Sequence, residues 1–359
     1  MEKVYTVTFQ RVLNYGAVLQ AYALMRFLQE EGYDVEVLDY APSYFLIQTC
    51  RPAKGIKKTL DKIKKYKKFS EFRNKFMKLT PKTYLTKNSL KTLPVAHAAV
   101  CGSDQIWNYK LTGNNFDSTY FLDFAPTETK RIAYAASAGS IRISESAKSV
   151  ESVLSKFDNI GTREAVLAAD VKEIVPSSKP EVVVDPCLLI KDYSEVFDST
   201  RVPETPYVVT YVVGSGEMLE KFNDRVLEFK KLTNIPIIHI GAKPIKAADQ
   251  NILDIGPSEW ASFIKKATYV VTNSFHGTAF SVNFEKNFLF IPHVVENLNS
   301  RQVTLLENVE LIEQMINPES NISELPEIDY ELVNVKLERI VSESKSYLLS
   351  SLSNEIQNK

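Results

Sequence analysis

The stretch KVYTVTFQRVLNYGAVLQAYALMRFLQEEGYDVEVLDY, residues 3–40, predicts one complete strand–helix–strand unit. Its first residues alternate between apolar and polar side chains and are rich in β-formers, which indicates a strand over residues 3–9. After a polar turn at residues 14–16, apolar residues recur at helical spacing up to Gly32, and residues 33–40 again have the pattern of a strand. Two strands joined through a helix are expected to lie parallel in one sheet.

The same alternation continues along the chain and predicts two α/β domains. Further strand-like runs include VAHAAVCG, RIAYAASAG and EVVVDP, and the polar segment 198–206 with its two prolines is typical of a linker. The alternation then restarts with PYVVTYVVG. We therefore expect two Rossmann-like, doubly wound parallel sheets at 1–200 and 201–330 that face a central cleft, and a helix at 331–359 that packs back across them.

Composition and missing motifs exclude several classes of protein. The 43 basic and 44 acidic residues give a net charge of −1, so no global charge favours nucleic acid. The three cysteines lack metal-ligand spacing, and no apolar run approaches the roughly 20 residues that span a bilayer. GxGxxG, GxSxG, HExxH and P-loop motifs are missing, and the GSG loop at 214–216 is only a weak phosphate signal. We expect a cytoplasmic protein without a metal or a bound cofactor.

Residues 54–79 depart from the α/β alternation and predict a basic amphipathic helix. Apolar residues recur there every three or four positions, and lysines fill most of the positions between them. One interpretation is a helix that covers its own domain and turns its lysines to water. The other is an interfacial helix that makes peripheral contact with anionic lipid at the inner face of the cell membrane.

The segment VVTNSFHGTAF, residues 270–280, places His276 between a predicted strand and a predicted helix. Backbone N–H groups at the start of a helix favour anions, and imidazole side chains titrate near neutral pH. The position fits a catalytic His276, with Ser274, Gly277 and Thr278 as candidates for substrate binding, and it fits a structural histidine equally well. His293, at the end of the next predicted strand, could reach the same edge.

Three other strand ends carry candidate residues. Arg163 follows a glycine–threonine turn, where a guanidinium can hold a carboxylate or phosphate; the alternative is a salt bridge with Glu164 or a nearby acid. Asp104, in the loop GSDQIWN, could act as a base or bind a sugar hydroxyl, or could stabilise a turn. Asn14 and Gly16, in the first turn, are further candidates for substrate contact.

Six motifs occur in one order across most of the chain: NYGAVLQAYAL, GSDQIWN, AYAASAG, GTRE, VVVDPCLL and VVTNSFHGTAFSVNF. As an ordered set they resemble the polysaccharide pyruvyl transferase family. The resemblance implies a GT-B-like pair of α/β domains, with the N-terminal domain on the acceptor side and the C-terminal domain on the donor side. It also implies transfer of pyruvate from phosphoenolpyruvate, a co-substrate, to a sugar as a ketal. His276 then matches the catalytic histidine, and Arg163 the substrate-binding arginine.

One position departs from the family pattern. Many members carry an arginine two residues before the histidine, where this chain has Ser274, and Arg301 is the candidate replacement cation. The acceptor implied by the resemblance is a lipid-linked sugar of a capsule or exopolysaccharide precursor. Two alternatives remain open: a glycosyltransferase of the same architecture with a nucleotide-sugar donor, and a non-catalytic relative that binds glycan or lipid. The sequence does not define the acceptor sugar or the oligomeric state.

Overall fold

The computed structural model describes residues 1–52, 55–145, 149–295, 298–316, 322, 325 and 327–353, without the side chains of residues 48, 50 and 57. The chain divides into two compact units. The N-terminal unit comprises Met1–Arg51, Arg73–Ile190 and Glu338–Lys359, and the C-terminal unit comprises Pro52–Phe72 and Lys191–Leu337. Within the described ranges, no helix is both long and apolar enough to cross a membrane.

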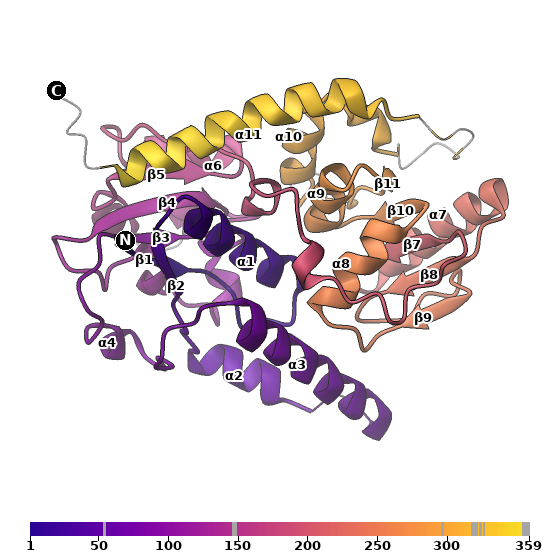
Figure 1. The fold of residues 1–359 in the computed structure, drawn as a ribbon, viewed down its shortest axis with the longest axis horizontal. Helices are drawn as coiled ribbons and strands as arrows, with labels where there is room; N and C mark the ends of the chain where they lie inside the picture. The colour runs from indigo at the N-terminus through magenta and orange to yellow at the C-terminus, as the bar shows by residue number, and fades with distance from the viewer. Residues whose placement is uncertain are drawn as a thin grey trace. The chain divides into compact units, whose positions relative to one another are not determined.

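A six-stranded parallel sheet forms the centre of the N-terminal unit (Figure 1). Its order is β2-β1-β3-β4-β5-β6, and Val4 of β1 lies between Val35 of β2 and Ala98 of β3. The order reverses direction between β1 and β3, so the carboxyl ends of these two strands mark the switch point where ligands of such sheets bind. The strands are β1 (Lys3–Val7), β2 (Asp34–Val37), β3 (Ala98–Cys101), β4 (Lys130–Ala136), β5 (Asn159–Thr162) and β6 (Glu181–Val182).

Helices cover both faces of this sheet. On one face, Leu24 of α1 (Tyr15–Glu30) lies against Gly102, and Tyr347 of α11 (Tyr330–Leu352) donates a hydrogen bond to the carbonyl of Ala133. On the other face, α5 (Val150–Leu154) and α6 (Ala165–Ile174) share an apolar core with the strands and with Trp107. Two further helices are α2 (Ser43–Cys50) and α4 (Lys87–Leu90).

The C-terminal unit contains a five-stranded parallel sheet of order β11-β10-β7-β8-β9. Numbered within the unit, this is the 3-2-1-4-5 arrangement of Rossmann sheets, with its switch point between β7 and β10. The strands are β7 (Val208–Tyr211), β8 (Ile237–Ile240), β9 (Gln250–Ile252), β10 (Tyr269–Thr272) and β11 (Asn287–Phe290). Phe222 and Phe229 of α7 (Glu217–Thr233) belong to the core on one face. On the other face, α8 (Pro257–Lys266) and α9 (Phe275–Asn283) meet through Trp260 and Phe280, and α10 (Ser300–Asn308) packs beside α9.

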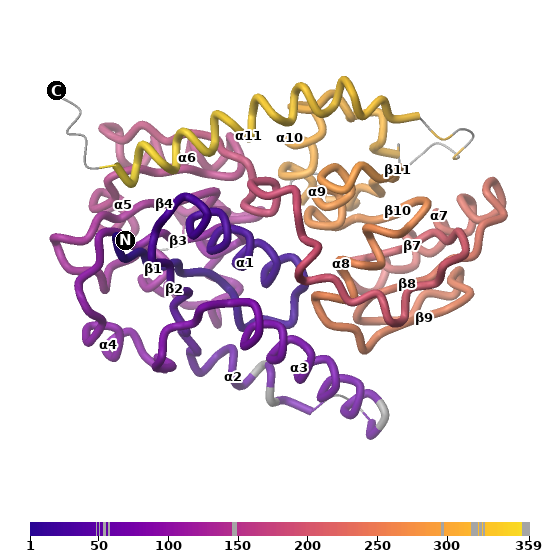
Figure 2. The backbone as a smooth tube through the Cα atoms, in the orientation of Figure 1, coloured from indigo at the N-terminus to yellow at the C-terminus, as the bar shows by residue number. Residues whose placement is uncertain are grey.

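Two long helices contribute residues to both units. The trace in Figure 2 runs without a break through α3 (Ile56–Phe76), which is divided after Phe72, and through α11, which is divided after Leu337. The predicted ranges 1–200, 201–330 and 331–359 therefore differ from the units at residues 52–72, at residues 191–200 and at the division within α11. An amphipathic pattern shows that a helix has a buried face, but it does not identify the core that buries it. Residues 54 and 354–359 of the predicted segments lie outside the described residues.

The fold class predicted from the sequence is confirmed, because both sheets are parallel and flanked by helices. Several local boundaries differ from the prediction: β1 and β2 are shorter than the predicted strands at 3–9 and 33–40. The first helix begins at Tyr15, inside the predicted turn, because the side chain of Asn14 caps it by accepting a hydrogen bond from the backbone N–H of Ala17 at 3.3 Å.

Candidate active site

The switch point of the C-terminal sheet is held by Asn273, which directly follows β10. Its side-chain oxygen accepts a hydrogen bond from the backbone N–H of Val213 at 2.7 Å, and its side-chain nitrogen donates to the Val213 carbonyl at 2.8 Å. Val213 lies just beyond the end of β7. Both α7 and α9 begin at these strand ends, so two helix N-termini, which favour anions, flank the switch point.

Ser274 caps α9. Its hydroxyl oxygen accepts a hydrogen bond from the backbone N–H of Gly277 at 3.4 Å, and its own backbone N–H donates to the hydroxyl of Thr272 at 3.0 Å. A Cβ atom on Gly277 would lie 2.4 Å from that Thr272 hydroxyl, so only glycine lets the first turn of α9 approach β10 this closely. Thr278 is fully buried and donates its hydroxyl to the Ser274 carbonyl at 3.1 Å. The predicted substrate-binding residues of this segment thus form one compact helix start.

His276 occupies the second position of α9 and is 5% exposed. Its ring meets that of Phe275 edge-on, with the two centroids 5.2 Å apart. The imidazole therefore lies in the first turn of the helix, at the carboxyl edge of the sheet, as the sequence predicts. A catalytic role for this residue stays a prediction.

Helix α10 brings Arg301 to the same helix start. The Arg301 guanidinium lies 6.0 Å from the centre of the Phe275 ring, and the neighbouring Gln302 donates to the Asn273 carbonyl at 3.2 Å. The candidate replacement cation is thus next to the residue that precedes His276. A partly buried guanidinium at this position can add positive charge where the family pattern has an arginine at position 274.

His293 follows β11, and its backbone is bracketed by Asn299. The Asn299 side chain accepts the His293 N–H at 2.7 Å and donates to the His293 carbonyl at 2.8 Å. The Nδ1 atom of His293 accepts the N–H of Val295 at 3.2 Å, and burial lowers the pKa of the ring. Both effects favour the neutral imidazole with its proton on Nε2, so His293 is suited to donate a hydrogen bond from Nε2 rather than to act as an acid.

The switch point of the N-terminal sheet joins the ends of β1 and β3. Thr8 donates its hydroxyl to the Ser103 carbonyl at 3.0 Å, and Gln20 of α1 donates to the Thr8 hydroxyl at 2.7 Å. Asp104 follows with a φ of 70°, and its carbonyl accepts the N–H groups of Ile106 and Ser137. Its carboxylate forms no hydrogen bond with any residue that the structure describes. The turn is therefore stabilised by the Asp104 backbone, and a role for the carboxylate in binding or catalysis stays a prediction.

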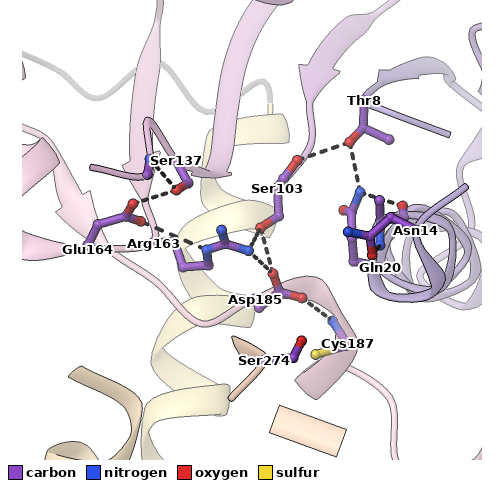
Figure 3. Close-up of polar contacts among 12 residues, drawn as sticks. Thr8, Asn14, Gln20, Ser103, Ser137, Arg163, Glu164, Asp185, Cys187 and Ser274 are labelled. Carbon is purple, nitrogen blue, oxygen red and sulfur yellow. Dashed lines mark hydrogen bonds and ion pairs between the residues drawn. The ribbon is translucent and has the colours of Figure 1, made fainter. Parts of the chain in front are cut away.

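Arg163 is at the centre of a buried polar network (Figure 3). Its Nη1 atom donates to Asp185 at 2.8 Å and to the Ser103 hydroxyl at 3.3 Å, and Ser103 donates to the same Asp185 oxygen at 2.7 Å. Glu164 lies 3.8 Å from Nε of Arg163. Burial acts to lower the pKa of Arg163, but the carboxylates of Asp185, Glu164 and Asp104 outweigh it and raise the pKa above its ordinary value.

These contacts tie three strand ends together. Ser103 follows β3, Arg163 follows β5, and Asp185 accepts the N–H of Cys187 at 3.0 Å in the short 3₁₀ turn Pro186–Leu188. Arg163 is 3% exposed and forms a salt bridge with Asp185. A salt bridge with a nearby acid is one of the two interpretations that the sequence allowed. Direct contact between Arg163 and a substrate stays a prediction.

Asn14 and Gly16 lie at the start of α1, where Asn14 is the cap and Gly16 is buried in the first turn.

Sequence reasoning assigned no role to Asp185, Ser103 or Asn273. The signal for Asp185 was present in the motif VVVDPCLL, because an aspartate before a proline at a strand end is a typical turn cap. Asn273 directly follows a buried strand, and Ser103 closely follows one. A position after a strand does not by itself show what a side chain binds.

Solved structures similar to this chain contain two Rossmann-like domains. S. aureus MnaA, solved with UDP, aligns with a TM-score of 0.50 and 15% identity over 97% of both chains. A Listeria monocytogenes protein assigned as a UDP-N-acetylglucosamine 2-epimerase aligns with a TM-score of 0.52 and 10% identity over 97% of this chain and 90% of its own. At these identities the likeness shows the fold alone, which is the predicted GT-B-like one.

No curated protein sequence matches this chain. The sequence profile of the polysaccharide pyruvyl transferase family does match it, over residues 14–293. The matched region includes the switch point of the C-terminal sheet, α9 and its His276, the loop after β3 and the strand end that carries Arg163, whereas β1 precedes it. The protein therefore belongs to the polysaccharide pyruvyl transferase family.

Proposed function

We propose that the protein transfers pyruvate from phosphoenolpyruvate to a sugar of a lipid-linked, cell-surface polysaccharide precursor and forms a pyruvate ketal. Family membership implies a transferase. The observation that carries the finer proposal is the start of α9, where His276, the Ser274 cap and the Phe275–Arg301 contact gather at the switch point of a Rossmann sheet.

The donor is an anion with a carboxylate and a phosphate, and the C-terminal unit offers three kinds of group to hold it. The N–H groups at the start of α9 point out of the helix, and the Ser274 hydroxyl lies beside them. Arg301 supplies the full positive charge. In this proposal Arg301 replaces the arginine that many family members carry at position 274, and His293 donates a hydrogen bond from Nε2 to the substrate.

The proposed reaction begins with proton transfer from His276 to the methylene carbon of phosphoenolpyruvate. The electron pair of the double bond forms the new C–H bond, so the methylene carbon becomes a methyl group and C2 becomes an oxocarbenium-like centre that a sugar hydroxyl attacks. Phosphate then leaves C2, and a second hydroxyl of the sugar closes the ketal. The two hydroxyl protons balance the reaction, since one restores the imidazolium and the other leaves with phosphate. General acid catalysis of this kind contributes about 10²–10⁴-fold, and the step needs no metal or bound cofactor.

The N-terminal unit supplies the acceptor side in this proposal. The Asp104 carboxylate orients or deprotonates the attacking hydroxyl, and Asn14 and Gly16 contribute contacts from the start of α1. Arg163 neutralises substrate charge, and its bond to Ser103 fixes the loop that carries Asp104. The buried Asp185 holds the guanidinium in place.

The test is incubation with phosphoenolpyruvate and a panel of lipid-linked or nitrophenyl sugars. The expected result is release of phosphate together with a product whose mass has increased by a pyruvate ketal, in the presence of a chelator as well as in its absence. His276→Ala should lose on the order of 10²-fold or more in kcat, and Arg301→Ala should mainly raise the KM for phosphoenolpyruvate.

His97→Gln is the matched control, because His97 precedes β3 at the amino end of the sheet and its Nε2 contacts the Leu352 carbonyl at 2.6 Å. Full activity in His276→Ala would refute the mechanism. Turnover of a nucleotide sugar without turnover of phosphoenolpyruvate would instead identify a glycosyltransferase. Binding of glycan without any turnover would identify a non-catalytic relative.

A further inference from the structure

Helix α3 has two apolar faces rather than the single stripe that its sequence suggests. Phe69 and Phe72 are buried in the protein, whereas Ile56, Leu60 and Ile63 are 83%, 52% and 57% exposed. Leu60 and Phe69 are nine residues apart, which is two and a half turns at about 3.6 residues per turn, so they lie on opposite sides of the helix. The exposed residues at 56, 60 and 63 follow one another at helical spacing and form what we call the aliphatic stripe.

The buried side of α3 is fixed within the C-terminal unit. Lys68 donates to both carboxylate oxygens of Glu259, at 2.8 and 2.7 Å, and a Cβ atom on Gly256 would lie 2.8 Å from Cβ of Lys68. The helix therefore packs closely on the start of α8 and cannot rotate to bury its other face there. The aliphatic stripe is held toward solvent by this packing.

The charge around the stripe is strongly positive. Residues 56–76 contain eight lysines and one arginine against two acidic residues. Lys64 and Lys67, one turn beyond Leu60 and Ile63, are both exposed, and the acid nearest to Lys67 is Glu71 at 3.7 Å on the same helix. The positive charge therefore favours a partner with a negatively charged surface. The aliphatic side chains between the lysines favour a partner that also has an apolar interior beneath that surface.

We propose that the aliphatic stripe of α3 docks the protein on an anionic membrane surface, with the helix lying flat at the level of the headgroups. A second copy of the chain is disfavoured as the partner, since two such helices would bring like charges together. A nucleic acid would pair with the lysines but would leave the three aliphatic side chains in water. The proposal concerns binding alone and holds whether or not the protein transfers pyruvate.

The test measures co-sedimentation of the full chain with vesicles, without any substrate. Vesicles of phosphatidylglycerol and phosphatidylcholine should bind the protein at low salt, and vesicles of phosphatidylcholine alone should not. Lys64→Glu/Lys67→Glu should weaken binding by more than about 25-fold, since each lysine near the surface contributes roughly fivefold and each glutamate adds repulsion. Ile56→Ser/Leu60→Ser/Ile63→Ser should abolish binding at the same salt concentration.

Matched controls come from exposed positions elsewhere in the C-terminal unit. Leu332→Ser/Val335→Ser removes two exposed aliphatic side chains of α11, and Lys231→Glu/Lys246→Glu reverses two exposed lysines. Both controls should bind vesicles like the unchanged protein. All four variants should keep the circular dichroism spectrum and the melting temperature, because none alters a buried side chain.

Three results would overturn the proposal. The first is equal binding to both kinds of vesicle, and the second is unchanged binding in the stripe variant. The third is a change of oligomeric mass in the stripe variant with binding intact, which would show that the stripe joins copies of the chain. The vesicle experiment does not depend on catalysis. A negative result would therefore not count against the proposed transferase activity, which the phosphoenolpyruvate assay tests separately.

Discussion

Replacing Asp185 by alanine should destabilise the N-terminal unit more than any surface change in it. The carboxylate is completely buried, and it accepts hydrogen bonds from Arg163, Ser103 and the backbone of Cys187. Removing one partner of a buried ion pair costs about 3–5 kcal/mol, because the remaining charge is left without compensation. Glu164, 3.8 Å from the guanidinium, offsets part of this loss, so we expect about 3 kcal/mol.

The measurement is urea unfolding followed by tryptophan fluorescence. The chain has two tryptophans, and Trp107 is buried in the N-terminal unit, where it stacks on Phe121 with centroids 5.1 Å apart. In a Trp260→Phe background its signal reports that unit alone. Glu173→Ala is the control, since it breaks an exposed pair with Arg142 and should cost about 0.5 kcal/mol or less. A cost below about 1 kcal/mol for Asp185→Ala would refute the claim that Asp185 holds the guanidinium.

Two further predictions concern the C-terminal unit. Burial lowers the pKa of His239 from 6.5 to about 4, so the unfolded chain takes up the proton first as the pH falls. The free energy of unfolding should be at its full value above pH 6.5 and decline by about 3 kcal/mol down to about pH 4, a decline that urea titrations should find reduced in His239→Gln. Gly277→Ala forces a Cβ against the Thr272 hydroxyl and should cost about 1–3 kcal/mol, together with a higher KM for the donor. Unchanged kinetics and stability in Gly277→Ala would show that the start of α9 is not tightly packed.

The sequence predicted most of the fold because its periodicities are local. Alternation of strands and helices requires parallel sheets, and the strand-to-helix junction at Ser274 places His276 at a carboxyl edge without any knowledge of long-range contacts. The position of Arg163 was likewise predictable from the turn that precedes it.

The rest depends on contacts between segments distant in sequence. Asp185 pairs with Arg163 across 22 residues, and Lys68 of α3 finds Glu259 across 191. Neither pairing leaves a local pattern in the sequence. For α3, the periodic apolar residues predicted a single apolar face, whereas the structure has two on opposite sides of the helix. The position of Arg301 against Phe275 could not be predicted either, because it depends on how α10 packs on α9.

The last segment of the N-terminal unit has a consequence for how the chain folds during synthesis. Glu338–Lys359 belongs to this unit, where Tyr347 donates a hydrogen bond to the Ala133 carbonyl and Ser344 accepts one from the Val184 N–H. About 150 residues separate this segment from Ile190, so at ~5–20 residues per second it emerges from the ribosome roughly 7–30 s after the rest of the unit. During that interval Gly161 and the strand surface beneath Tyr347 are uncovered, and the N-terminal unit is completed only after the C-terminal unit has been translated.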